Sequence, residues 1–580
     1  MRRVLQQLKE YRRDTAFCVG LTTLEVIMEI LMPFITARLL AEGLEAGDLP
    51  AVYRYGAVLV ALALFSLIFG AMAGRFAASA SSGLAANLRE AIYDNIQTFS
   101  FSNIDKFSVP GLVTRMTTDI TNVQQAFMMV IRIAVRSPLT LIFSFAMCML
   151  INVQLSLTFL IALAFLVTVV GVIMAVTLKI FNQVFRKYDD LNASVQENVS
   201  AIRVVKAFVR EEYEDKKFAR ASKNLRDLSV KAEGLLAFNG PAMMTAVYFC
   251  IVMVSWLGAH FIVVDGTLGT ADLTSLYSYI MSLLMSLMML SMVVVMISMS
   301  LASIRRIREV LDETPDIRDP ENPVLEVKDG SIDFDHVSFS YKRGSGKSAL
   351  SDIDLHISSG QTIGVIGGTG SGKSSLVNLI CRLYDVDEGC VKVGGVDVRD
   401  YDTEVLRDQV SVVLQKNTLF SGTILDNLRW GNPNATEEEC AQACRAACAD
   451  EFIDRLPDGY HTRIERGGAN VSGGQKQRLC IARALLKKPK VLILDDSTSA
   501  VDTATDAKIR AAFAREIPGT TKLIIAQRIS SVQDADKILV LDDGRIDAFD
   551  THENLLKSNA IYQEIYDSQV KGGGDFDQPA

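Results

Sequence analysis

A glycine-rich segment between an apolar run and a helical run constrains this sequence more than any other feature. It reads Gly367-Gly368-Thr369-Gly370-Ser371-Gly372-Lys373-Ser374, follows the run 362–366 and precedes a helix that opens at Ser375. Glycines let the backbone approach phosphate groups and point successive N–H groups at them, while the helix offers its positive N-terminal end. Lys373 is placed to bind the β- and γ-phosphates, and Ser374 to direct its hydroxyl at Mg²⁺. The loop residues and Ser375 therefore predict a site for a nucleoside triphosphate.

A chain of 580 residues is too long for one hydrophobic core, so at least two domains are expected. Before about residue 305 there are several runs of about 20 or more mostly apolar residues, and after it short β-branched stretches alternate with helical ones. The net charge of −8 says little about partners, because two different parts contribute to it, and nothing suggests nucleic acid. We predict a transmembrane domain over 1–310, a proline-containing linker over 311–328, a nucleotide-binding α/β domain over 329–570 and a disordered tail over 571–580.

Six stretches of the first part are long and apolar enough to cross a lipid bilayer. They are expected at about 15–40, 55–78, 127–151, 155–178, 243–264 and 273–300. Residues 41–53, 152–154 and 265–272, which follow the first, third and fifth stretches, contain no Lys or Arg, whereas the long segments after the second and fourth are rich in both. Because positive loops stay cytoplasmic, and residues 1–13 form a basic amphipathic segment, we predict a multi-pass protein of the cell membrane. Its N-terminus and its nucleotide-binding domain would both be cytoplasmic.

Charged and methionine side chains inside the spans each allow two interpretations. Glu25 and Glu29 lie one helical turn apart, as do Arg132 and Arg136, and such charges need either a polar cavity or an ion partner. A substrate cavity or gate and simple ion pairing therefore both fit. The last span is rich in methionine, which suits varied apolar ligands but is also ordinary packing material. These residues are Met281, Met285, Met288, Met289, Met292, Met296 and Met299.

The nine cysteines form neither a disulfide framework nor a zinc motif. Cys440, Cys444 and Cys448 recur every fourth residue of a predicted helix, but one helix face cannot surround a metal. We interpret them as small packing residues.

Two further features of the second part fit a nucleotide site. A buried apolar strand ends in Asp495 and Asp496, and Asp495 is placed to hold Mg²⁺ through water. Tyr341 follows two expected strands, 332–334 and 337–339, and its ring is available to stack on adenine.

Five segments occur in the order found in ATP-binding cassette (ABC) proteins. They are the phosphate loop, Gln415 after an apolar strand, Val471-Ser472-Gly473-Gly474-Gln475, the strand ending at Asp495, and Ser499-Ala500-Val501-Asp502. With six spans ahead of the cassette, and Arg115-Met116-Thr117-Thr118-Asp119 in the first cytoplasmic segment, the chain resembles an ABC exporter half-transporter of the multidrug type over nearly its whole length. The resemblance implies a six-helix transmembrane domain fused to an α/β P-loop domain. It also implies an ATPase that exports hydrophobic or amphipathic compounds, such as drugs, lipids or peptides, by alternating access.

The resemblance further implies roles for individual residues. Two cassettes would pack head to tail, so that each ATP lies between the phosphate loop of one chain and the signature segment of the other. In this chain the signature is Ser472, Gly473, Gly474 and Gln475, with Asp502 nearby. Gln415 would contact Mg²⁺ and link the nucleotide to the membrane domain, and segments around 105–120 and 205–220 would act as coupling helices.

Three positions depart from the family pattern. Where the family has a glutamate as general base, this chain has Asp496, which is one methylene shorter, and a displacement of about 1 Å can cost on the order of 100-fold in rate. Where the family has a switch histidine, this chain has Gln527, which can bond a phosphate but cannot shuttle a proton. Arg466 stands where the family has an acidic residue before the signature.

Both catalytic substitutions, Asp496 and Gln527, fall in one ATP site, while the signature that serves the other site is intact. This asymmetry resembles the degenerate-site subunit of a heterodimeric exporter, whose partner is a second, non-identical half-transporter. Two alternatives stay open at this point. One is a homodimer in which Asp496 acts as a weaker base, and the other is an ATP-gated regulatory or channel-like subunit that does not pump.

Overall fold

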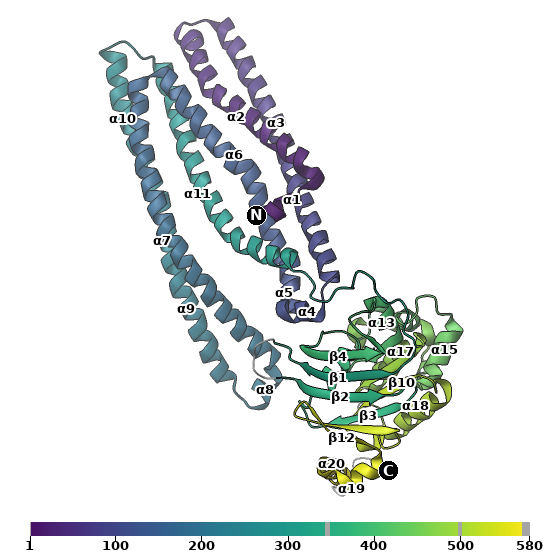
Figure 1. Cartoon of the computed structure of the whole chain (residues 1–580). Helices are drawn as coiled ribbons and strands as arrows, with labels where there is room; N and C mark the ends of the chain where they lie inside the picture. Colours follow the sequence, from purple (N-terminus) through teal and green to yellow (C-terminus); the bar gives the residue numbers. More distant parts are fainter. Residues whose placement is uncertain (1, 343–347, 497–500, 571–580) are drawn as a thin grey trace. The chain divides into compact units, whose positions relative to one another are not determined.

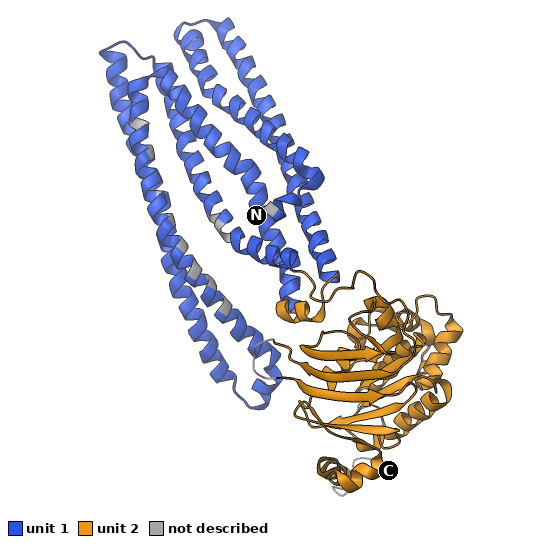
Figure 2. Cartoon of the chain, viewed as in Figure 1, with its two compact units in different colours: residues 1–97, 109–313 blue, residues 98–108, 314–580 orange. Residues whose placement is uncertain are grey.

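The computed structural model of the chain describes residues 2–342, 348–496 and 501–570. The chain forms two compact units, each with a hydrophobic core of its own (Figure 2). The first unit comprises residues 1–97 and 109–313, and the second comprises residues 98–108 and 314–580. The tail predicted over 571–580 lies outside the described residues.

The described part of the first unit is helical throughout (Figure 1). Its elements are α1 (Arg2–Gln6), η1 (Lys9–Tyr11), α2 (Arg12–Arg38), η2 (Leu39–Glu45), α3 (Leu49–Gln97), α5 (Val109–Thr114), η3 (Arg115–Asp119), α6 (Ile120–Ile151), α7 (Val153–Ser200), α8 (Ile202–Ala207), α9 (Glu211–Ala237), α10 (Asn239–Val263) and α11 (Thr270–Asp312). Within the described residues, six helical segments are long and apolar enough to span a membrane, which confirms the predicted number. The 49-residue α3 and the 48-residue α7 are each roughly 70 Å long at 1.5 Å per residue, against a hydrocarbon core of about 30 Å. Both helices therefore extend well beyond the membrane.

Packing in the first unit joins helices that are distant in sequence as well as neighbours. Helix α2 packs along α3, and α6 packs along α11. Tyr279 of α11 is fully buried, and its hydroxyl donates a hydrogen bond to the carbonyl oxygen of Ile30 at 2.8 Å. At the start of α6, the buried carboxylate of Asp119 accepts a hydrogen bond from Nε of Arg306 at 2.7 Å. Hydrogen bonds made by buried groups such as Tyr279 and Asp119 fix the register of α11 against α2 and α6.

The described part of the second unit has two main sheets. The six-stranded sheet has the order β12-β11-β3-β10-β9-β6 and is parallel except for the pair β11–β12, and the four-stranded antiparallel sheet has the order β2-β1-β4-β5. The strands are β1 (Ile332–Phe339), β2 (Leu350–Ile357), β3 (Thr362–Gly367), β4 (Glu388–Val393), β5 (Val396–Asp397), β6 (Val410–Val413), β7 (Gly422–Thr423), β8 (Arg463–Ile464), β9 (Val491–Asp495), β10 (Thr521–Ile525), β11 (Lys537–Asp542) and β12 (Arg545–Asp550). β9 and β10 are buried along their whole length, as expected for the apolar central strands of a parallel sheet. The predicted α/β fold is thus confirmed.

One strand differs from the prediction. Residues 332–334 and 337–339 were expected to be two strands, but they form the single strand β1. The register against β2 shifts between Phe334 and Val337, and His336 has a φ of 47°, which identifies a β-bulge. The polar residues that interrupt the apolar pattern therefore mark a bulge within one strand.

The second unit includes a helix, α4, that lies more than 200 residues before the linker in the sequence. Its helices are α4 (Phe101–Phe107), α12 (Lys373–Ile380), α13 (Thr403–Gln409), α14 (Ile424–Leu428), α15 (Glu437–Ala446), α16 (Asp450–Ile453), η4 (Gly459–His461), η5 (Arg466–Gly468), α17 (Gly473–Leu486), α18 (Thr503–Glu516), η6 (Ile529–Ser531), α19 (His552–Ser558) and α20 (Ala560–Val570). The hydroxyl of Tyr384 donates to Oδ2 of Asp105 at 2.7 Å, and Oγ of Ser102 donates to Oδ2 of Asp316 at 2.7 Å. These bonds explain why α4 belongs to the second unit.

Each of the coupling segments predicted around 105–120 and 205–220 overlaps a short helix, α4 or α8, at its beginning. Helix α4 ends before most of the predicted segment 105–120, because α5 and η3 already lead into the long helix α6. Likewise α8 begins before 205–220, because the long helix α9 starts at Glu211. The helical pattern is continuous in both places, so the sequence alone does not show where the short helices end.

Candidate nucleotide site

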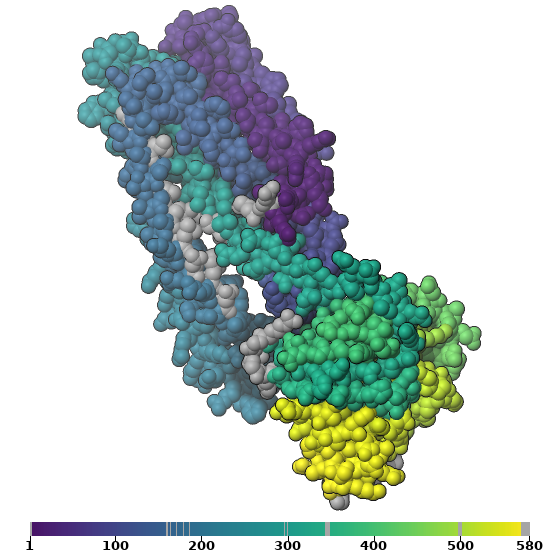
Figure 3. Space-filling view, viewed as in Figure 1, coloured from purple at the N-terminus to yellow at the C-terminus, as the bar shows by residue number. Residues whose placement is uncertain are grey.

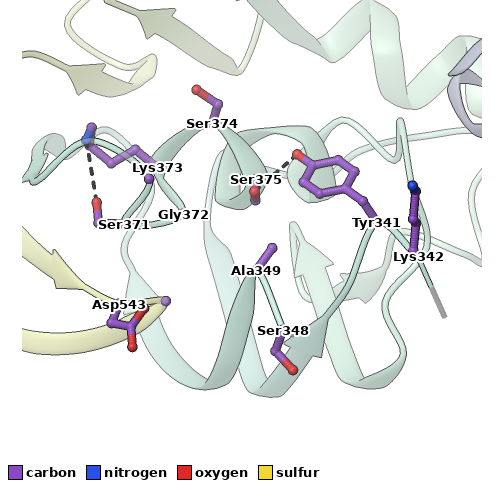
Figure 4. Close-up of a pocket in the computed structure, with 12 residues that line it drawn as sticks. Tyr341, Lys342, Ser348, Ala349, Ser371, Gly372, Lys373, Ser374, Ser375 and Asp543 are labelled. Atoms are coloured by element: carbon purple, nitrogen blue, oxygen red, sulfur yellow. Dashed lines mark hydrogen bonds between the residues drawn. The ribbon is translucent and has the colours of Figure 1, made fainter. Parts of the chain in front are cut away.

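The phosphate loop connects β3 to α12 in the second unit. β3 pairs in parallel with β10 on one side and β11 on the other, so the loop leaves a central strand at the carboxyl edge of the sheet. Gly372 has a φ of 98°, and a Cβ at this position would lie 2.7 Å from Cδ2 of Leu350, so the loop requires glycine here. Nζ of Lys373 donates to the carbonyl oxygens of Gly367 and Gly368 at 2.9 and 2.7 Å, and Figure 4 shows its side chain beside Ser371.

A cavity of about 540 Å³ opens beside this loop (Figure 4). Tyr341 forms part of its wall: the hydroxyl is hydrogen-bonded to Oγ of Ser375 at 3.1 Å and accepts from Nδ2 of Asn378 at 3.3 Å. The ring packs edge-on against Phe339 and Tyr384, yet 49% of Tyr341 stays exposed. An aromatic surface is therefore held in place at the cavity, available to a nucleotide base. The lining residues are Tyr341, Lys342, Ser348, Ala349, Gly370, Ser371, Gly372, Lys373, Ser374, Ser375, Asp543 and Gly544.

Oxygen atoms suited to a divalent cation meet at the start of α12. Oγ of Ser374 donates to Oδ1 of Asp495, the last residue of β9, at 3.3 Å. Burial raises the pKa of Asp495, opposed by the hydrogen bond from Ser374, and the charge of Asp496 raises it further. Burial likewise lowers the pKa of Lys373, while the charges of Asp495 and Asp496 oppose this change. Two buried carboxylates beside one ammonium group fit Mg²⁺ on one side and phosphate on the other.

Asp496 is held by two glutamine side chains. Its Oδ2 accepts a hydrogen bond from Nε2 of Gln527 at 2.7 Å and another from Nε2 of Gln415 at 3.3 Å. Parallel pairing of β9 with β10 places Asp495 opposite Ile525, which brings the residues after each strand to the same edge of the sheet. Asp496 is buried and has a φ of 47°, a conformation that costs a residue other than glycine on the order of 1–3 kcal/mol. The fold thus gathers three predicted site residues from three separate segments.

The signature segment forms the beginning of α17, and its first two residues are exposed. The backbone N–H of Ser472 donates to Oε1 of Gln475 at 2.8 Å, and Oγ of Ser472 accepts from the N–H of Gln475 at 3.3 Å, which is a capping box. Gly473 and Gly474 form the first turn, and Ser472 and Gly473 are solvent-exposed. Among the described residues, the cavity at the chain's own phosphate loop is not lined by any of these four.

Asp502 begins the next helix. Its Oδ1 accepts the N–H of Thr505 at 2.9 Å as the N-cap of α18, and this hydrogen bond lowers the pKa of Asp502. Ser499 and Ala500 of the same predicted motif lie outside the described residues.

The sequence analysis missed one wall of the cavity. Asp543 and Gly544, in the turn between β11 and β12, line it, and the N–H of Gly544 donates to the carbonyl oxygen of Ser371 at 3.2 Å. The Asp-Gly pair predicts a tight turn. Its position next to the phosphate loop depends on the parallel pairing of β11 with β3, which no local pattern shows.

In the first unit, the charged residues of the spans form an ion triad. Nη1 of Arg136 lies 2.7 Å from Oε1 of Glu25, and its Nη2 lies 2.6 Å from Oε2 of Glu29. Gly70 of α3 provides the space, since a Cβ there would lie 2.9 Å from Oε1 of Glu25. Of the two interpretations of these residues, this geometry favours ion pairing between α2 and α6. Arg132 has no ion pair among the described residues.

The second unit combines a phosphate loop, a carboxylate suited to Mg²⁺ and a glycine-rich helix N-terminus, and the described part of the first unit contains six helices that can span a membrane. Together these features define a membrane transporter driven by ATP. The family described as "ABC transporter transmembrane region" matches residues 15–312, and the family described as "ABC transporter" matches residues 350–499. The chain belongs to the ABC transporter family. It is an ABC exporter half-transporter, a multi-pass membrane protein with an ATP-hydrolysing domain.

Individual relatives agree over nearly the full length. An uncharacterized ABC transporter ATP-binding protein of Bacillus subtilis, YfiB, is 35% identical over 569 residues, which cover 98% of this chain and 98% of YfiB. An ATP-dependent lipid A-core flippase of Desulfotalea psychrophila is 34% identical over 489 residues, 83% of this chain and 84% of the flippase. The solved structure of a bacterial Atm1-family ABC exporter with ATP bound superposes with a TM-score of 0.83 at 26% identity, covering 96% of this chain and 99% of that one. The six-helix transmembrane domain fused to a cassette is thereby confirmed.

Proposed function

We propose that this chain is the degenerate-site subunit of a heterodimeric exporter in the cell membrane, with its N-terminus and cassette in the cytoplasm. Its phosphate loop binds ATP with little turnover, and its signature completes the hydrolytic site of a second, non-identical half-transporter. ATP-driven closure of the two cassettes turns the membrane cavity outward, and hydrolysis at the partner's site resets it. Residues 1–310 would form the transmembrane domain that moves the cargo, and residues 329–570 would form the domain that binds nucleotide. Residues 311–328 would link the two domains.

The hydrogen bonds of Asp496 are the observation that carries the proposal. A general base must offer an oxygen to the attacking water within hydrogen-bond reach. Oδ2 of Asp496 already accepts from Gln527 and Gln415, at 2.7 and 3.3 Å. Both partners are amides, which donate but do not take up a proton at neutral pH. A short carboxylate held in this way is a poor base, which supports binding without rapid turnover.

The intact phosphate loop supports tight nucleotide binding. Lys373 would bind the β- and γ-phosphates, and Tyr341 would stack on adenine. Ser374, Gln415 and Asp495 would hold Mg²⁺, whose charge would offset that of the phosphates. At Gly372 a side chain would have neither a favourable φ nor enough space, so this form of the loop depends on glycine.

The exposed signature supports the role in the partner's site. Ser472 and Gly473 are exposed to solvent at the start of α17, and the positive end of a 14-residue helix suits the γ-phosphate of a nucleotide. Asp502 caps the neighbouring helix α18 and would lie at the same interface. Neither segment carries the substitutions seen at Asp496 and Gln527.

The membrane domain supports hydrophobic or amphipathic cargo. The methionines of α11 with exposed side chains form a deformable apolar surface that can adapt to varied ligands; they are Met281, Met285, Met288, Met289 and Met292. The side chain of Met299 lies outside the described residues. Helices α4 and α8 would transmit the movement of the cassettes. A lipid-flipping relative makes lipid-like cargo a reasonable first candidate beside drugs and peptides.

Affinity purification of the tagged chain from its native membrane tests the proposal. A second half-transporter should co-purify, with a glutamate and a histidine at the positions equivalent to Asp496 and Gln527. In that complex Asp496→Asn should reduce ATPase activity only modestly, whereas removal of the partner's glutamate should nearly abolish it. Rapid ATP hydrolysis and cargo movement by this chain alone in liposomes would overturn the heterodimer. Steady ion conductance without cargo movement would instead favour a regulatory subunit.

A further inference from the structure

The C-terminal helix α20 binds the backbone on both sides of Gln527. Oε1 of Gln569 accepts the N–H of Ile529 at 2.9 Å, and Nε2 of Gln569 donates to the carbonyl oxygen of Gln527 at 2.8 Å. One planar amide thus uses its acceptor and one donor on a segment of three residues. The arrangement resembles the pairing between neighbouring strands, with a side chain in place of the second strand.

Residues 527–529 follow the end of β10 and lie outside the sheet, so their backbone groups need hydrogen-bonding partners from elsewhere. After β10 ends, the N–H of Ala526 still donates to the carbonyl oxygen of Val365 at 3.2 Å, and the next turn closes when Ser531 donates to the carbonyl oxygen of Arg528 at 3.2 Å. Ile529 between them is buried, so its N–H would otherwise lose a hydrogen-bonding partner on folding. The side-chain amide of Gln569 accepts this hydrogen bond.

Helix α20 is anchored near its start, and Gln569, which is solvent-exposed, lies close to its end and outside the nucleotide cavity. Tyr562 is fully buried, its hydroxyl is hydrogen-bonded to Nδ1 of His552 at 2.7 Å, and its N–H donates to Oδ1 of Asn559 at 2.8 Å. Figure 3 shows the C-terminal segment, in yellow, closely packed at one end of the second unit. An amide on such a support can restrain the loop that it binds.

We propose that Gln569 is the positioning residue for Gln527. It fixes the backbone from which the Gln527 side chain reaches Asp496, where Nε2 lies 2.7 Å from Oδ2. The C-terminal helix thereby becomes part of the nucleotide site without touching the nucleotide. This inference rests on the proposed function and deepens it: the side-chain amide of Gln527, at the switch position, would bond a phosphate of the ATP held by this chain's phosphate loop.

Hydrogen exchange tests the contact itself. In Gln569→Leu, which keeps the size of the side chain but removes both hydrogen bonds, the amide of Ile529 should exchange about tenfold faster. Gln563→Leu is the matched control, because Gln563 lies on the same helix but donates to the carbonyl oxygen of Leu556 at 2.6 Å. Unchanged exchange at Ile529 in Gln569→Leu, or an equal change in Gln563→Leu, would overturn the inference.

Nucleotide affinity tests the consequence. For the intact transporter, titrated with trinitrophenyl-ATP, Gln569→Leu should weaken binding about three- to tenfold and Gln527→Ala to a similar extent. The double variant should be no weaker than Gln527→Ala alone, because one residue acts through the other. Two results would overturn the positioning role of Gln569 without affecting the proposed function. One is a double variant whose loss of affinity equals the sum of the two single losses. The other is normal affinity in Gln569→Leu together with weakened affinity in Gln527→Ala. Normal affinity in Gln527→Ala would instead contradict the proposed function of the switch position.

Discussion

Nε2 of Gln527 lies 2.7 Å from Oδ2 of Asp496, so the residue at the switch position binds the residue at the base position directly. The double substitution Asp496→Glu with Gln527→His would lengthen the carboxylate by one methylene and replace the amide with a group that can exchange a proton. We expect ATP turnover at this chain's own site to rise about tenfold or more. The measurement is the ATPase rate of the complex in which the partner's base has been removed. Adding Asp495→Asn should return the rate to background, and no rise in the double variant would show that another feature limits this site.

The ion triad of the first unit predicts an asymmetric response to substitution. Arg136→Met leaves Glu25, which is 6% exposed, and Glu29 without their counter-ion, and breaking such a pair costs about 3 kcal/mol. The apparent melting temperature of the purified transporter should fall clearly. It should recover when Glu25→Gln and Glu29→Gln are added, because the uncompensated charges are then gone. Arg132→Met, one turn away, is the control, and a loss equal to that of Arg136→Met would contradict the account.

Features carried by contiguous residues could be predicted from the sequence. Six apolar runs predict six spans, because each run on its own is long enough to cross the bilayer. The segment from Gly367 to Ser374 predicts its own strand-loop-helix structure, since glycine conformation and helix formation are local. Asp495 could be placed as well, because it ends a run of buried residues.

Features that depend on the order of strands are not visible in local sequence patterns, and only the family resemblance predicted that Asp496 and Gln527 share one ATP site. Asp496, Gln415 and Gln527 meet only because β6, β9 and β10 are neighbours in one parallel sheet. The turn at Asp543 lies beside the phosphate loop for the same reason. The bulge in β1 was missed because a polar residue such as His336, at a φ of 47°, looks in sequence like the end of a strand.

The cysteines predict a simple labelling result. Of the nine, Cys390 is partly exposed and the other eight are buried, and burial raises the pKa of Cys444 to about 12. Because the thiolate is the reactive form, a maleimide should label one thiol in the folded transporter and nine after denaturation. Mass spectrometry of the labelled peptides checks this. Cys390→Ser should abolish native labelling, whereas rapid labelling of Cys440, Cys444 or Cys448 would contradict their place in the core.

The docking of α4 within the second unit should depend on pH through Asp316. Burial raises the pKa of Asp316, but hydrogen bonds from Ser100 and Ser102 more than offset this, so its pKa lies below the usual range. A carboxylate with a depressed pKa stabilises the fold fully above its unfolded pKa, and this contribution disappears as the pH falls through the folded value. Protection of the α4 amides from hydrogen exchange should therefore fall below about pH 4.

The Asp316→Asn variant separates this effect from general acid unfolding. It cannot accept the same charge-assisted bonds, so its α4 should already be less protected at neutral pH, and the difference from the natural chain should shrink as the pH falls. Glu321→Gln, exposed in the same linker, should behave like the natural chain at every pH. If the natural chain and Asp316→Asn lose protection in parallel over the whole range, the carboxylate of Asp316 does not hold α4 in place.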